Sequence, residues 1–172
     1  MVLKRFFLPL CLVLLLSGCL DFSGFTMSGK SSLTKDVQIT SISVDKSARR
    51  MYLLSENTII RSYRIGLGFT PNGHKSLTGD GKTPEGLYYI DRKNPNSKFY
   101  MSLGISYPNA QDRAYAQSMG ASAGGDIFIH GQNKNPRFWK RDWTEGCIAV
   151  KDHEIQEIYA LVPIGTPILI TP

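Results

Sequence analysis

Two short segments of the chain carry residue types that could act together in nucleophilic chemistry. The apolar run Asp126–Gly131 delivers His130 at its end, beside a glycine. The segment Asp142–Val150 contains Cys147, directly before a second apolar run. Two core strands, one ending in a histidine and the other starting at a cysteine, are a rigid way to place a base next to a nucleophile.

This pairing predicts cysteine acyl-transfer chemistry. A thiol near its reference pKa of about 8.5 is only a few per cent ionised at neutral pH, and a neighbouring imidazole can hold it as a thiolate–imidazolium ion pair. We therefore expect Cys147 to be the nucleophile and His130 the base. Gly146 has no side chain to keep a carbonyl substrate away from the backbone, so the N–H groups of Gly146 and Cys147 are the expected oxyanion hole, at about 3 kcal/mol for each donor.

The cysteine count supports this hypothesis without deciding it. The chain has three cysteines, and two of them, Cys11 and Cys19, lie in the first twenty residues. Once those are removed or modified, Cys147 is the one thiol left for a compartment where unpaired thiols are uncommon. A cysteine packed as a small hydrophobe is the alternative; it predicts slow alkylation and a thiol pKa above about 8.5, because burial disfavours the thiolate.

The N-terminus has the layout of an export signal. Lys4 and Arg5 precede the apolar run Phe6–Leu16, which is shorter than the roughly 20 residues of a membrane span. The run ends in Leu16-Ser17-Gly18-Cys19, which resembles the lipobox of bacterial lipoproteins. An ordinary secretory signal is the alternative.

These features predict three parts of the chain. Residues 1–18 are the expected signal peptide, residues 19–36 the lipidated Cys19 with a flexible tether, and residues 37–172 one catalytic domain. Acyl chains on Cys19 would anchor the domain to a membrane. Leu20 directly after the cysteine favours a periplasmic protein held at the outer membrane.

Composition excludes several other functions. The formal net charge of +6 is mild, and no basic stripe with interleaved aromatic residues is present, so a nucleic-acid partner is not expected. Gly81-Lys82-Thr83 resembles the end of a phosphate loop, but the required first glycine is Ser76 and no βαβ pattern surrounds it. No two histidines share a metal-ligand spacing, and both His74 and His153 are expected at the surface.

The remaining pattern predicts a mainly-β domain with two helices. Helices are expected at residues 109–119, with Asn109 as N-cap, and at residues 151–161, with Asp152 as cap. A glycine-rich loop is expected at residues 73–86 and a polar turn at residues 91–98. Gly66 and Gly68 indicate a bulge or a close backbone approach. The expected strands are 37–44, 51–54, 59–67, 87–90, 126–130, the run after Cys147, and 168–170.

The motifs are similar to those of a known family. His130-Gly131, followed by Thr144-x-Gly146-Cys147-Ile148, resembles the signature of the L,D-transpeptidase (YkuD-like) family, in which a histidine precedes Ser/Thr-x-Gly-Cys. The similarity extends to three further segments: Val44–Lys46, Gly79–Gly86 and Pro163–Pro167.

This resemblance implies an L,D-transpeptidase-like β-sandwich or barrel, Cys147 as nucleophile, His130 as base, and no metal or cofactor. It implies that the substrate is the tetrapeptide stem of peptidoglycan, cut between the L-centre of diaminopimelate and D-Ala, with an amine as acceptor. That amine could belong to an acceptor lipoprotein. The expected substrate-binding residues surround the pair: Gly131, Arg141, Trp143 and Thr144.

Two departures from the family pattern keep alternatives open. Glu145 stands where many members have histidine, and Ala149 where many have arginine or asparagine. Arg137, Lys140 and Arg141 are cations that could bind a stem carboxylate instead. A hydrolase on the same scaffold, either an L,D-carboxypeptidase or an amidase that detaches a lipoprotein from the wall, is the second hypothesis. A wall-binding lipoprotein without catalysis is the third.

Overall fold

The structure is a computed structural model of the 172-residue chain, and it describes residues 38–132 and 141–172. The expected signal peptide, Cys19, the tether, Arg137 and Lys140 all lie outside these residues. The described residues belong to one compact unit, Leu33–Pro172. No helix within them is long and apolar enough to cross a membrane.

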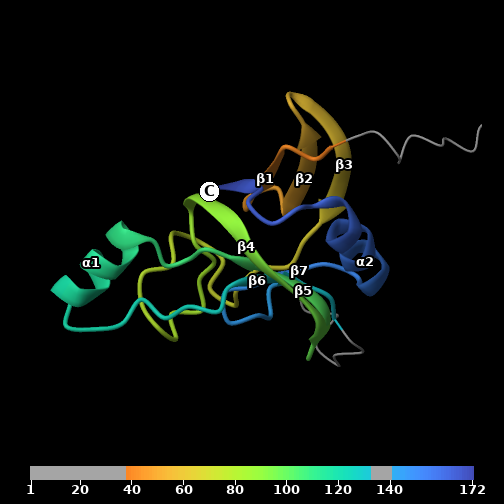
Figure 1. Cartoon of the computed structure of the whole chain (residues 1–172). Helices are drawn as coiled ribbons and strands as arrows, with labels where there is room; N and C mark the ends of the chain where they lie inside the picture. The colour runs from red at the N-terminus through yellow and green to blue at the C-terminus, as the bar shows by residue number, and fades with distance from the viewer. Residues whose placement is uncertain (1–37, 133–140) are drawn as a thin grey trace, which may run out of the picture. The chain divides into compact units, whose positions relative to one another are not determined.

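Eight strands form one mixed sheet in the order β3-β2-β1-β8-β4-β5-β6-β7 (Figure 1). Three of them form an antiparallel meander, and β8, near the C-terminus, joins it parallel to β1. The bounds of these four strands are Ser41–Asp45 (β1), Arg50–Ser55 (β2), Thr58–Arg64 (β3) and Pro167–Thr171 (β8). Their inward residues, including Ile42, Val44, Met51 and Leu53, alternate with more exposed ones, as expected for a sheet with one buried face.

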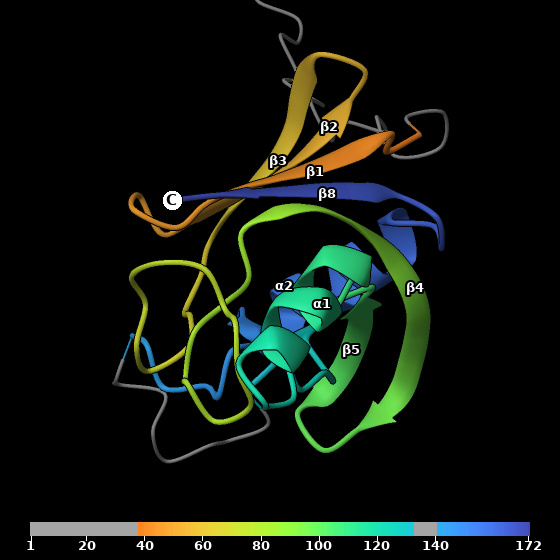
Figure 2. The same cartoon turned by 90° about the vertical axis from the view of Figure 1, so that its left-hand side faces the viewer.

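The strand β4, Gly86–Ser97, connects the two parts of the sheet. Its first residues pair with β8 and its later residues with β5, Tyr100–Ile105, and Figure 2 shows it curving from one to the other. The polar turn expected at residues 91–98 is therefore wrong. The exposed polar residues there lie on the solvent side of a strand, and register shifts accommodate Pro95, as β-bulges do.

The two helices lie at opposite ends of the described unit (Figure 1). The helix α1, Ala110–Ser118, has Asn109 as its N-cap, as predicted: the side chain accepts from the N–H groups of Gln111 and Asp112. The helix α2, Asp152–Leu161, buries Ile155 and Ile158 against the sheet. Its N-cap is Lys151 and not the expected Asp152, because the Glu154 carboxylate accepts from the Lys151 N–H. The predicted mainly-β class with two short helices is confirmed.

Candidate active site

The two shortest strands bring the segments that carry His130 and Cys147 side by side. The strand β6, Phe128–His130, is parallel to β7, Ile148–Ala149, with Ile129 opposite Ile148 and His130 opposite Ala149. Cys147 directly precedes β7, and because side chains alternate along a strand, its register position lies on the same side of the ladder as His130. The sequence places these two residues seventeen positions apart; the sheet places them on adjacent chain segments.

The thiol of Cys147 is partly exposed and held by the backbone of the neighbouring segment. Its Sγ lies 3.5 Å from the carbonyl oxygen of Asp126, to which it can donate. Burial raises the pKa of this thiol to about 11, and the charges of Asp126 and Glu145 add to the rise, against a lowering by the Phe128 N–H. In the described residues, no hydrogen bond joins the sulfur to the His130 ring. The expected thiolate–imidazolium pair is therefore not formed in this structure.

The hydrogen bond of the His130 ring defines its tautomer. Its Nδ1 lies 2.6 Å from the carbonyl oxygen of Gly131, and since a carbonyl only accepts, Nδ1 must carry the hydrogen. The lone pair is then on Nε2, the atom a general base would use. The side chain is only 3% exposed, and this burial lowers the pKa of His130. The hydrogen bond to the Gly131 carbonyl oxygen acts in the opposite direction and raises it.

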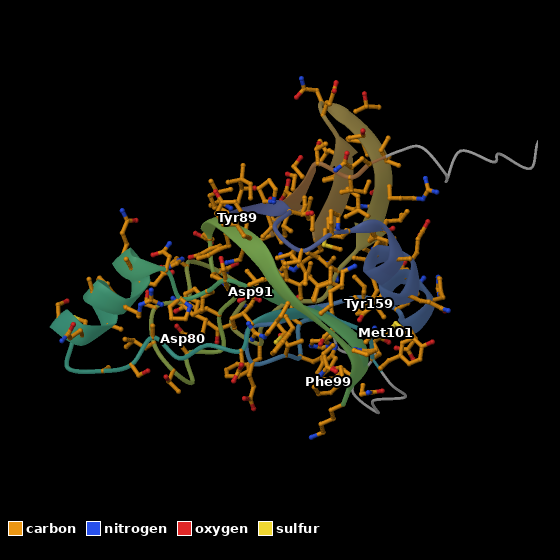
Figure 3. The ribbon with its side chains drawn as sticks, viewed as in Figure 1. Asp80, Tyr89, Asp91, Phe99, Met101 and Tyr159 are labelled. Carbon is orange, nitrogen blue, oxygen red and sulfur yellow. The ribbon has the colours of Figure 1, made fainter. Side chains whose placement is uncertain are left out.

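Two aromatic rings enclose this imidazole. Phe99, in the turn between β4 and β5 (Figure 3), stacks on the His130 ring at a centroid distance of 4.6 Å and an interplanar angle of 24°. Trp143 meets the edges of both rings, at 5.7 Å from His130 and 5.6 Å from Phe99. Sequence reasoning missed Phe99, because a single aromatic residue next to the segment interpreted as a polar turn carries no signal of its own.

A neutral thiol beside a neutral imidazole is a different starting state from the ion pair. With a pKa of about 11, only about one thiol in 10⁴ is ionised at pH 7, so a preformed thiolate contributes little. The free Nε2 can instead take the proton while the sulfur attacks. The raised pKa is what a packed thiol would show, but a sulfur sealed in the core would not be partly exposed.

The turn before Cys147 is shaped by Thr144. Its buried hydroxyl donates to the carbonyl oxygen of Cys147 at 2.7 Å and accepts from the Gly146 N–H at 3.2 Å. Of the two N–H groups expected to bind an oxyanion, the one on Gly146 is therefore already engaged. The Cys147 N–H has no acceptor among the residues that the structure describes, so it is the donor left for an oxyanion.

Gly146 is required for a reason that the sequence did not indicate. Its φ is +134°, and a Cβ there would lie 2.6 Å from the carbonyl oxygen of Lys82. Gly68 is as crowded, since its Cβ would lie 2.1 Å from the carbonyl oxygen of Gly81. The glycine-rich loop at residues 73–86 thus packs directly on the turn that carries Cys147. The predicted close approach at Gly68 is confirmed.

The four residues expected to bind substrate occupy different environments. Gly131 is buried below the Phe99 carbonyl and α2, and its own carbonyl orients His130. Thr144 is buried and engaged in its turn. Trp143 is partly buried beside His130, and Arg141 is exposed. These positions leave Trp143 and Arg141 as the side chains that an incoming substrate could reach.

His74 is not the ordinary surface residue that the sequence indicated. Its Nδ1 accepts from the Glu85 N–H at 3.0 Å, so its Nε2 carries the hydrogen and faces the buried Asp112 carboxylate at 3.2 Å. His74 therefore ties the glycine-rich loop to α1. Residues 38–132 and 141–172 contain no group of three or more His, Cys, Asp or Glu placed to hold a metal.

Comparison with known proteins identifies the family. The profile of the L,D-transpeptidase catalytic domain (YkuD) matches residues 39–170, which include both Cys147 and His130. The chain belongs to this family.

Individual relatives with L,D-transpeptidase names are similar to most of this chain. YafK of Escherichia coli strain K12, an L,D-transpeptidase by name, is 30% identical over 171 residues, covering 90% of this chain and 63% of YafK. YkuD of Bacillus licheniformis, named in the same way, is 29% identical over 131 residues, covering 76% of this chain and 65% of that protein.

Among solved structures, a variant of the helical cell shape determining protein Pgp2 of Campylobacter jejuni superposes with a TM-score of 0.61 at 26% identity. That match covers 78% of this chain and 47% of the Pgp2 chain. The chain thus spans less than two thirds of the length of these relatives.

Proposed function

We propose that this chain is a cysteine acyltransferase that acts on the tetrapeptide stems of peptidoglycan. The observation that supports the proposal is the β6–β7 register: Cys147 directly precedes the strand paired with β6, on the same side of the ladder as His130, whose Nδ1 is engaged by the Gly131 carbonyl oxygen. Membership of the YkuD family supports the substrate class. The name of Pgp2 links that relative to cell shape, and we propose cell-wall organisation as the process served here.

In the first half-reaction, Sγ of Cys147 attacks the carbonyl carbon between the L-centre of diaminopimelate and D-Ala, while Nε2 of His130 takes the thiol proton. The Cys147 N–H stabilises the oxyanion. When the C–N bond breaks, the imidazolium returns this proton to the departing D-Ala amine, and the stem remains on Cys147 as a thioester.

In the second half-reaction, an acceptor amine attacks the thioester. His130 takes a proton from that amine and returns it to the departing sulfur, so the enzyme is restored and a new amide is formed. The acceptor could be another stem, a free D-amino acid or a lysine of an acceptor lipoprotein. Arg141 and Trp143, the accessible pair beside the site, are proposed to contact the stem.

A hydrolase is the second candidate, favoured by the residues around the thiol. Glu145 places an exposed carboxylate beside Cys147, and the buried Ala149 supplies no polar group at the position next to His130. Water would then replace the amine in the second half-reaction. The product would be a tripeptide stem, or a lipoprotein detached from the wall.

Intact-protein mass spectrometry tests the proposal. The chain is mixed with disaccharide tetrapeptide, and the expected result is a Cys147 adduct with the mass of the substrate minus D-Ala, absent in Cys147→Ala. Adding an amine acceptor separates the two candidates, because a transferase gives the cross-linked product and a hydrolase gives the tripeptide in both conditions. If no adduct forms with the stem or with a carbapenem, the proposal is wrong.

For the N-terminal part, we propose removal of residues 1–18, lipidation of Cys19, a tether over residues 19–36 and a periplasmic domain held at the outer membrane. The Leu16–Cys19 lipobox supports this assignment. Expression of Cys19→Ser beside the unaltered chain tests it. The expected result is that the substitution moves the protein from the outer-membrane fraction to the soluble fraction, and an unchanged distribution would contradict the anchor.

A further inference from the structure

One turn, between β1 and β2, reaches both loops that flank the nucleophile. From this turn, the buried side chain of Lys46 donates to the carbonyl oxygens of Gly73 and Thr83 and to the Glu85 carboxylate, at 2.7, 3.0 and 2.8 Å. All three N–H bonds of its ammonium are therefore used within the protein. Lys46 fixes the glycine-rich loop, which in turn packs on Gly146.

Arg49, three residues later in the same turn, reaches the other loop. Its guanidinium forms a fork with the Asp142 carboxylate, with Nε 3.1 Å from Oδ1 and Nη2 2.9 Å from Oδ2. Each side chain is 17% exposed. Asp142 Oδ1 also accepts from the Leu67 N–H at 3.1 Å. A bidentate, partly buried pair of this kind fixes geometry more firmly than a single surface contact.

Backbone bonds and one hydroxyl hold the rest of the turn that carries Cys147. After it, Gly66 and Ala149 exchange two backbone bonds at 2.8 and 2.9 Å, and within it the Thr144 hydroxyl bonds to the Cys147 carbonyl oxygen and the Gly146 N–H. The strand β7 that follows it contains only Ile148 and Ala149. Upstream, two backbone bonds join Thr144 to the Leu67–Phe69 segment, at 3.1 and 2.9 Å. Asp142 lies five residues before Cys147, and its carboxylate joins the start of this turn to both Arg49 and the Leu67 N–H.

We propose that Arg49 is a positioning residue for the reaction at Cys147. By fixing Asp142, its guanidinium sets the turn that presents both the Cys147 sulfur and the Cys147 N–H to the acyl group. This inference rests on the proposed function, because it concerns the acylation step. It adds a residue ninety-eight positions away in sequence, from the opposite half of the sheet.

Three variants of the full-length chain test it. Arg49→Gln removes the fork and the charge, and Arg49→Lys keeps the charge without the fork. Arg61→Gln is the matched control, because Arg61 forms an equally close pair with Glu157, at 2.6 Å, between β3 and α2. The rate of Cys147 acylation by disaccharide tetrapeptide is measured at several substrate concentrations, with thermal unfolding recorded for each variant.

We expect Arg49→Gln to lower kcat about 10- to 100-fold with little change in KM, since a nucleophile displaced by about 1 Å loses rate and not binding. Arg49→Lys should recover part of the loss, and Arg61→Gln should stay within about twofold of the unaltered chain by the same reasoning, as no reacting group moves. Equal rates for Arg49→Gln and Arg61→Gln would overturn the proposal. A loss in Arg49→Gln that matches its unfolded fraction would overturn it as well.

Two further measurements test the positioning role of Arg49 independently of the acyltransferase activity. Amide hydrogen exchange at residues 143–147 and alkylation of the Cys147 peptide by iodoacetamide need no substrate. We expect both to be faster in Arg49→Gln than in Arg61→Gln, because the released turn exposes the sulfur. If the unaltered chain forms no adduct, the acyltransferase assignment is wrong, and these rates still decide whether Arg49 fixes the turn. Identical rates in the two variants would contradict the positioning role.

Discussion

At one end of the sheet, β2 and β3 pair along strands of six and seven residues, whereas at the other end β6 and β7 have three and two. The long ladders around β1 and β8 are backed by fully buried residues such as Ile42, Leu53 and Ile168. Around Cys147, Ile129 and Ile148 are also fully buried, but the turn itself is held by glycine contacts and by side chains that bond to backbone, from Lys46, Asp80 and Asp142.

The difference shows that two parts of the sheet depend on different kinds of residue. The part around β1, β2 and β8, the framework, depends on buried apolar residues, whereas the site around Cys147 depends on glycines and on side chains that bond to backbone. Substitutions in the regular half should act on stability first, while substitutions in the other half should act on activity at small cost in stability. A hydrogen bond from a side chain to a backbone atom fixes the position of that atom. Greater burial of apolar side chains elsewhere cannot replace it. The following predictions test this separation.

The largest effect on activity is expected for Gly146→Ala. The new Cβ would lie 2.6 Å from the Lys82 carbonyl oxygen at a φ of +134°, so the turn or the loop must shift. A shift near 1 Å at the nucleophile should lower kcat/KM by about 100-fold or more. Gly165→Ala is the control, because its φ is also positive but no atom lies within 4 Å of its Cβ. Similar activity in the two variants would show that this contact does not position Cys147.

The framework half is tested by Leu53→Ala. Leu53 is completely buried on β2, and this truncation should lower the free energy of unfolding by about 2–5 kcal/mol. Denaturant unfolding measures the loss. The acylation rate of the protein that remains folded should be unchanged, since no site contact involves Leu53. A drop in that rate would mean that the two halves are not separable.

A pH effect is expected for Phe99→Leu. Burial lowers the pKa of His130, and a smaller residue in place of the stacked ring admits water, so this pKa rises toward its ordinary value. Because the base must be neutral, the acid limb of kcat/KM moves to higher pH. The rate should fall near pH 5.5 and stay the same near pH 8.

Two charged groups lie near the Phe99 and His130 rings, and the Phe99→Leu substitution leaves both in place. Lys98 Nζ lies 5.8 Å from the centre of the Phe99 ring, and the Asp152 carboxylate accepts from the Gln132 N–H. Tyr89→Leu, on the exposed side of β4 (Figure 3), serves as the control. An acid limb that coincides in both variants would exclude the role assigned to Phe99.

The smallest effect is expected for Glu145→Gln. The Glu145 carboxylate raises the pKa of Cys147, so its removal should lower that pKa and speed iodoacetamide alkylation near pH 8. Since Glu145 is exposed, solvent screens it and the gain should be about twofold or less. Glu56→Gln, in the turn between β2 and β3, should leave the rate unaltered. A slower reaction in Glu145→Gln would contradict the predicted sign.

The predicted class of the fold and both helices are confirmed, while Cys147 and His130 as the catalytic pair stay a prediction. These predictions rest on local patterns: the Asn109 cap of α1, the apolar face of α2, and the motifs around His130 and Cys147. The second half of β4 was missed, because a strand exposed on one side and interrupted by Pro95 resembles a polar turn. The strand β5, Tyr100–Ile105, was missed as well.

The arrangement around the site could not be predicted, because it depends on contacts between residues far apart in the sequence. The Arg49–Asp142 fork spans ninety-three positions, and the Gly146–Lys82 approach spans sixty-four. The protonation of the pair could not be predicted from the motif for a related reason. A motif gives residue types, whereas the pKa values of Cys147 and His130 depend on how deeply the fold buries them.

The central claim is that a neutral Cys147 thiol is deprotonated by His130 only as the acyl group is attacked. Measuring Cys147 acylation by the tetrapeptide and its alkylation by iodoacetamide across the same pH range tests this directly. The structure predicts acylation that rises through a pKa below about 6.5 and then levels, and alkylation that continues to rise toward about pH 11. Alkylation that levels near neutral pH would show a preformed thiolate and contradict the account.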